Sequence, residues 1–103
     1  MTYGRAHAKL SEAIEAMAVS AQHTIQQRLA IAYMFHLRSL DHHDLPRELQ
    51  SDFKKLEEKL MRIPAGFLTQ NSMSTEEAVE ITKEIIRLAR IVSGREVGGA
   101  HSA

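Results

Sequence analysis

The sequence lacks cysteine and tryptophan, and its 103 residues include only two prolines and five glycines. Without cysteine there are no disulfide bonds, no thiolate metal sites and no cysteine nucleophile. The longest apolar run, residues 29–35, is far shorter than the roughly 20 residues that span a bilayer, and the amino-terminal residues lack the apolar stretch of a signal peptide. We therefore expect a cytoplasmic protein that does not bind membranes.

The chain also has no excess of positive or negative charge, because 13 basic and 13 acidic side chains give a formal net charge of zero. Proteins that bind nucleic acids gain most of their affinity from clustered Lys and Arg, so an evenly mixed chain argues against a nucleic-acid partner. The nearest approach to a basic patch is Arg87, Arg90 and Arg95. These residues leave a nucleic-acid-associated regulator as the weakest of three functional alternatives.

Motifs for catalysis are absent as well. The sequence contains neither a glycine-rich phosphate loop nor a Gly-x-Ser-x-Gly nucleophile elbow. Its glutamates occur at spacings typical of solvated helix faces, which gives no sign of a buried acid and base pair. We therefore predict no enzymatic activity, no catalytic residue and no cofactor.

Apolar residues instead recur at alternating steps of three and four, which predicts an all-α fold: a small helical bundle in a single domain over residues 1–103. Helices are expected at about 5–40, 46–63 and 75–93, so one long amino-terminal helix would lie beside an antiparallel pair of shorter helices. The last helix begins at the cap Ser74 and carries a second apolar flank, Val79 and Ile86. Gly94 is expected to end it and to open a disordered tail, 94–103.

The first helix has one candidate interruption. No glycine or proline occurs between Arg5 and Leu40, which favours a continuous helix. Thr24 and Gln27, however, have the spacing of a capping box, so a new helix starting near Thr24 is the alternative. That alternative would give four helices of similar length and a closed monomeric bundle.

A continuous first helix of about 36 residues would span roughly 54 Å, about twice the length of either shorter helix. The two short helices would then cover only its second half. An apolar stripe near the amino end would stay uncovered: Leu10, Ile14, Met17 and Ala21. Since a marginally stable domain gains from burying such side chains, we predict a homodimer, or a complex with another protein partner, that uses this stripe as its interface.

Histidines provide the only candidate metal ligands. His42 and His43 lie between Asp41 and Asp44 in a polar connector, and His36 lies on the core-facing stripe. Adjacent residues rarely converge on one ion, so we predict no metal site and keep His36, His42 and His43 as weak candidates. The function favoured by the sequence is that of a small non-enzymatic interaction or regulatory protein acting as a homodimer. A small ligand- or metal-binding helical bundle is the second alternative.

Overall fold

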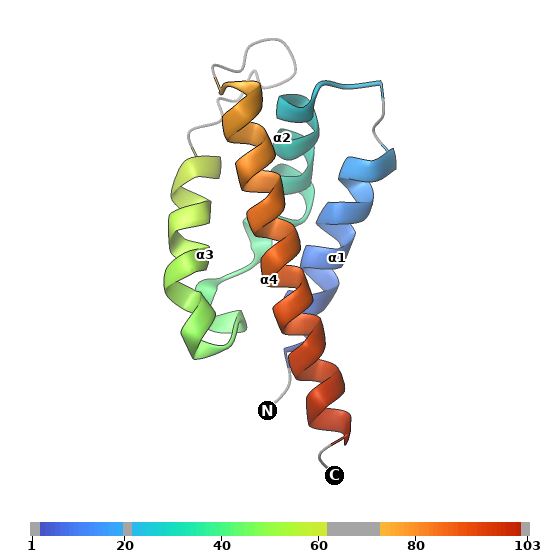
Figure 1. Cartoon of the computed structure of the whole chain (residues 1–103), viewed down its shortest axis with the longest axis vertical. Coiled ribbons are helices and arrows are strands. Elements are labelled where there is room, and N and C mark those ends of the chain that lie inside the picture. Colours follow the sequence, from blue (N-terminus) through green and yellow to red (C-terminus); the bar gives the residue numbers. More distant parts are fainter. Residues whose placement is uncertain (1–2, 20–21, 62–72, 102–103) are drawn as a thin grey trace.

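The structure, a computed structural model, describes residues 3–19, 22–61 and 73–101, with side chains as far as residue 94. The described residues form four α-helices and two short 3-10 helices (Figure 1). The α-helices are α1 (Gly4–Val19), α2 (Ile25–Phe35), α3 (Arg47–Leu60) and α4 (Thr75–His101), and the 3-10 helices are η1 (Leu37–Ser39) and η2 (His42–Asp44). No strand occurs within these ranges, so the predicted all-α helical bundle is confirmed.

The prediction of one continuous helix over residues 5–40 is wrong. α1 ends at Val19 and α2 begins at Ile25. The alternative, a new helix starting near Thr24, is therefore the one that the structure contains. The Thr24 hydroxyl accepts a hydrogen bond from the Gln27 backbone N–H at 3.2 Å, and the Gln27 side chain accepts one from the Thr24 N–H at 3.0 Å. In a continuous helix, these two N–H groups would donate to carbonyl groups of the preceding turn. Here they donate to side chains instead, so the chain can reverse direction without leaving them unpaired.

The carboxyl end of the predicted long helix also differs. α2 ends at Phe35, and the chain continues through η1 to Leu40, whose backbone is extended. The second predicted helix, 46–63, corresponds to α3. Pro46 precedes its first residue, and proline at a helix start costs no hydrogen bond because the first amides of a helix have no partner. Residues 62 and 63 lie outside the described ranges.

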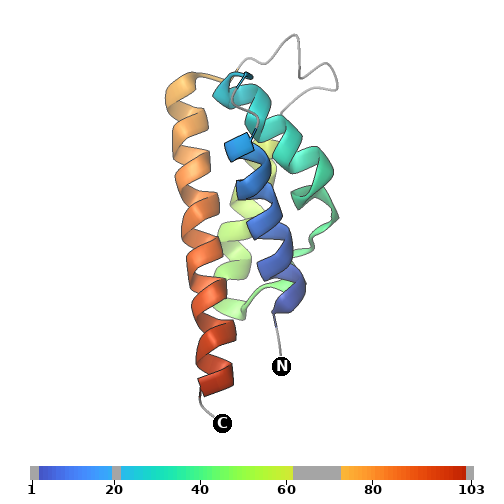
Figure 2. The same ribbon diagram turned by 90° about the vertical axis from the view of Figure 1, so that its right-hand side faces the viewer.

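The core is apolar and is formed by helices of a single chain. α1 lies beside α4 and α2, and α4 runs antiparallel to α1 (Figures 1 and 2). Two residues of the stripe that was expected to be uncovered are buried: Leu10 has no exposed surface, and Met17 is 7% exposed. The turn before Thr24 brings α2 back over α1, so both halves of the predicted rod share one core. The buried residues on the helices include Ala6, Leu10, Ala13 and Met17 in α1, Leu29, Ala30 and Ala32 in α2, Leu49, Phe53, Leu56 and Leu60 in α3, and Ala78, Ile81, Ile85, Leu88, Ala89 and Val92 in α4.

α4 begins as predicted but does not end as predicted. The Ser74 hydroxyl accepts a hydrogen bond from the Glu77 N–H at 3.0 Å, which caps the first turn. The helix then continues through Gly94 to His101, so the expected stop and the expected disorder of 94–101 are wrong. Gly94 does not adopt a positive φ, and a left-handed glycine is what would have ended the helix. α4 therefore extends beyond the other helices (Figure 2).

The length and the apolarity of the helices can be compared with what a membrane span requires. None of them, over the described ranges, combines the length and the apolar character that crossing a bilayer requires. α4 is the longest at 27 residues, but its exposed face carries several charged side chains, among them Glu80, Lys83 and Arg90. Such a face is typical of a helix that lies between a core and water.

Candidate functional sites: an apolar groove and a histidine cluster

Two adjoining hollows follow the line where α1 meets α4, and both include Ile14 and Ile86. One has a volume of about 210 Å³ and reaches α2, whereas the other is a shallower depression toward the end of α4. We call them together the α1–α4 groove. Its lining comprises Ile14, Met17, Ala18, Ile25, Arg28, Thr82, Ile85 and Ile86 in the first hollow, and His7, Ser11, Ala89, Arg90, Ser93 and Gly94, again with Ile14 and Ile86, in the second.

The floor of the α1–α4 groove offers apolar contact more than hydrogen bonding. Ile14 and Ile86 are half-buried, so each presents part of its side chain to solvent. The Thr82 hydroxyl donates to the Ala78 carbonyl at 2.8 Å, and the Arg28 Nε–H donates to the His23 carbonyl at 3.0 Å. The two polar side chains of the first hollow are thus engaged within the chain. A groove of this kind suits an apolar side chain from a partner more than a polar substrate.

The charged side chains in the lining of the groove are basic. Arg90 is exposed on α4, one turn after Ile86, and forms no ion pair within the described part of the chain. Glu15, although exposed on α1 next to Ile14, lines a separate hollow that includes Val19. The groove is therefore an apolar trough with a basic side chain at its edge.

The predicted interface residues do not all lie on one surface of the structure. Leu10 and Met17 lie in the core, although part of Met17 reaches the floor of the groove. Ile14 is accessible in the groove, and Ala21 lies outside the described residues. Ile86, on the second apolar flank of α4, was not predicted as a site residue. The signal for it was the width of the apolar arc of that helix, which exceeds what one neighbour covers.

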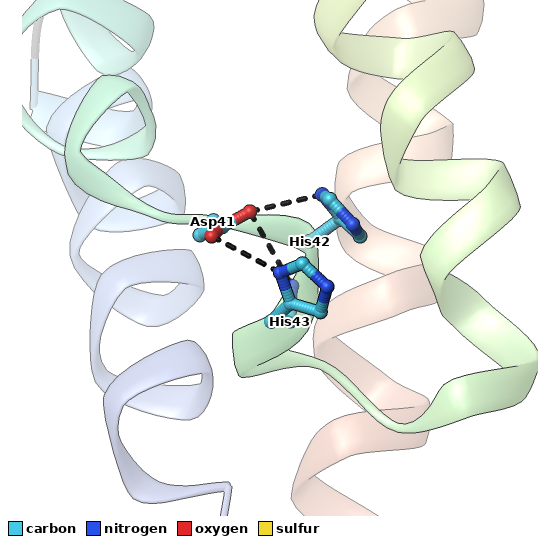
Figure 3. Close-up of side chains that lie close together, drawn as sticks. All are labelled: Asp41, His42 and His43. Carbon is cyan, nitrogen blue, oxygen red and sulfur yellow. Dashed lines mark hydrogen bonds and ion pairs between the residues drawn. The ribbon is translucent and has the colours of Figure 1, made fainter.

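A second candidate site lies in the connector between α2 and α3. The side chains of Asp41, His42 and His43 converge there, with one potential ligand atom from each lying within 4.8 Å of the others (Figure 3). The Nδ1 atom of His42 is 2.9 Å from one carboxylate oxygen of Asp41, and Nδ1 of His43 is 3.3 Å from the other. The imidazole ring centroids are 3.9 Å apart. Two of the three weak metal candidates are thus brought together.

Hydrogen bonds hold this connector in shape. The Asp44 carboxylate accepts a hydrogen bond from the Asp41 N–H at 2.9 Å, and the Asp41 side chain accepts one from the His43 N–H. Arg5 of α1 donates to the Ser39 carbonyl at 2.8 Å and lies 3.5 Å from the Asp44 carboxylate. The backbone of η2 is therefore fixed on both sides of the two histidines.

The electrostatics of the cluster favour an ionised Asp41. The hydrogen bond from the His43 side chain lowers the pKa of the Asp41 carboxyl below its usual value of 3.8, and the backbone N–H of His43 and the nearby imidazoles act in the same direction. Slight burial opposes this effect. The site thus presents a carboxylate and two imidazoles, which can bind a cation or a proton but do not form a recognisable nucleophile and base pair.

The remaining sequence candidates lie apart from this cluster. His36 faces Glu12 of α1, with 3.8 Å between Nδ1 and the carboxylate, and does not join His42 and His43. Arg87 bonds to Asp52 at 2.8 Å and to Glu84 at 3.0 Å, and these hydrogen bonds raise its pKa. A guanidinium already paired with two carboxylates is poorly placed to neutralise phosphate.

Of the suggested basic patch, only Arg90 is therefore left with a described and unpaired side chain, since the side chain of Arg95 lies outside the described set. Comparison with known proteins adds no assignment: no protein-family model matches this sequence, and no curated protein or solved structure matches it either.

Proposed function

We propose that this protein is a small non-enzymatic interaction or regulatory protein of the cytoplasm, and that it acts as a homodimer joined through the α1–α4 groove. The observation that supports this proposal is the groove itself: an apolar trough with Ile14 and Ile86 at its centre that the chain's own described helices leave open. Covering half-buried isoleucines contributes on the order of 1 kcal/mol or more each.

A second copy of the chain is the occupant that we propose. In a face-to-face pair whose two-fold axis runs along the groove, α1 of one copy lies over α4 of the other, so Ile14 and Ile86 of each copy are covered by the same apolar residues of its partner. The formal net charge of zero removes long-range repulsion between identical chains.

The basis of this dimer differs from the one predicted from sequence. Leu10 and Met17 now stabilise each protomer, whereas Ile14 and Ile86 face the partner. Replacing Leu10 or Met17 by aspartate would bury a charge in the core and unfold the chain, so such variants do not test association. Substitutions in the open part of the groove do.

The decisive experiment compares Ile86→Glu with a matched control, Val19→Glu. Val19 is 76% exposed on α1 and does not line the groove. We expect light scattering of the parent protein to give about 23 kDa, twice the chain mass of 11.6 kDa. Val19→Glu should remain a dimer, and Ile86→Glu should elute as a monomer with unchanged helical circular dichroism.

A parent protein that stays monomeric at high micromolar concentration would refute the homodimer. A dimeric Ile86→Glu protein would show that the copies meet on another surface. Binding of a different helical protein to a monomeric parent, abolished by Ile86→Glu, would keep the groove as an interaction surface but would replace the second copy as its occupant.

A further inference from the structure

We propose that Asp41, His42 and His43 form a binding site for a divalent transition-metal ion, with Zn²⁺ and Ni²⁺ as the best-suited ions. Neutral imidazole nitrogen and carboxylate oxygen are the ligands that these ions take in proteins. A site of this composition is independent of the α1–α4 groove, because the cluster lies on the connector between α2 and α3.

The distances are close to those that an ion requires. With ligand bonds of roughly 2.0–2.2 Å, neighbouring ligand atoms on one ion lie about 3 Å apart. The two Nδ1 atoms lie 2.9 and 3.3 Å from opposite oxygens of the same carboxylate. All three ligand atoms lie within 4.8 Å of one another, so rotation of exposed side chains is enough to close the set.

The reason that adjacent residues can converge here is the 3-10 turn. Asp41 precedes η2 in an extended conformation, so its carboxylate turns back over the turn and meets both histidine side chains (Figure 3). The hydrogen bonds of Asp44 hold this backbone in place, and Arg5 pairs with Asp44 instead of occupying the Asp41 carboxylate. Little backbone order therefore has to be gained when an ion binds.

The exposure of the side chains defines the kind of site. His42 is 23% exposed, whereas His43 and Asp41 are 72% and 61% exposed. Three protein ligands at the surface leave room for water on the ion, as in open rather than closed zinc sites. An Nδ1 atom that donates its proton to Asp41 in the free protein must lose that proton when an ion binds, and the imidazole then carries its remaining proton on Nε2. The charged groups next to the cluster are Asp44 and Arg5, which largely offset each other.

Isothermal titration calorimetry with ZnCl₂ and, separately, NiCl₂ at neutral pH tests the proposal on the full chain without a histidine tag. We expect one ion per chain with an affinity in the micromolar range. His42→Ala and His43→Ala should each weaken binding at least tenfold, and the double variant should abolish it. Asp41→Asn, which keeps the capping oxygen but removes the charge, should also weaken binding.

His36→Ala is the matched control, because His36 lies outside the cluster and should bind metal like the parent. Circular dichroism of every variant confirms that the fold is kept. Cobalt(II) absorption gives a second readout, since loss of an imidazole ligand changes its visible spectrum. Absence of binding at millimolar metal, or stoichiometric binding retained by the His42→Ala/His43→Ala protein, would overturn the proposal.

Discussion

At the scale of single residues, Thr24 marks the point where the structure departs from the predicted continuous helix. Its hydroxyl and the Gln27 side chain complete a reciprocal cap at the start of α2, and the Arg28 side chain adds a bond to the His23 carbonyl. These interactions stabilise a helix start in a segment that has neither glycine nor proline. The separation of α1 from α2 depends on them.

Thr24→Ala should lower the free energy of unfolding by about 1 kcal/mol, within the range of roughly 0.5–2 kcal/mol found for loss of a side-chain cap. Thr24→Ser retains the accepting hydroxyl and should stay within a few tenths of a kcal/mol of the parent. Urea denaturation followed by circular dichroism measures both. Equal stability of the alanine and serine variants would contradict a structural role for the cap.

The same residues show how far the sequence could be interpreted. The Thr24 and Gln27 spacing identified the cap, but spacing alone does not tell whether a helix already in progress continues across it. That choice depends on the core, because the reversal brings α2 back to α1, so that Leu10 and Met17 share one core with residues of α2. Similarly, the residue types of the metal candidates were evident, whereas their convergence on Asp41 depends on backbone angles in η2 that periodicity does not predict.

At the scale of helices, α1 and α4 are the pair that forms both core and groove. Alanines on the buried side of α1 allow α4 to approach closely, since small side chains shorten the distance between helix axes. The positions next to that contact, Ile14 and Ile86, are left at the open edge. The apolar stripes of both helices were predictable from sequence. Which flank of each helix remains exposed depends on how the helices are arranged around one another.

The continuation of α4 through Gly94 can be tested by Gly94→Ala. A Cβ atom at this position meets nothing within 4 Å, and the backbone is not left-handed. Alanine should therefore stabilise the protein by roughly 0.5–1 kcal/mol, because it favours a helix interior over glycine. Thermal or urea unfolding provides the measurement, and Ser93→Ala serves as a neighbouring control. A destabilising Gly94→Ala substitution would indicate the left-handed helix end that the sequence favoured.

At the scale of the whole molecule, the α1 side of the α1–α4 groove allows association to be tested by a second substitution. Ile14 lines both hollows and is half-buried. Ile14→Glu should weaken the dimer about tenfold or more, since it would place an unpaired carboxylate in an apolar interface. Sedimentation equilibrium of the parent and of the variant measures the effect.

An Ile14→Glu dimer as stable as the parent would show that the copies meet on another surface. Lys55→Glu, at an exposed residue of α3 that does not line the α1–α4 groove, gives the control for net charge. A loss of affinity in this control equal to that of Ile14→Glu would mean that overall charge, and not contact geometry, governs pairing.

The hairpin made by α1 and α2 has a consequence for how such a dimer would form and dissociate. A long helix with half of its apolar stripe exposed would not be stable in a single chain, so its folding would require an encounter between two chains. Because α1 and α2 share one core, a single chain can fold without a partner, and dilution of the proposed dimer would release folded protomers instead of denatured ones. The extent of dimerisation would then follow the concentration of the protein, without a folding step each time.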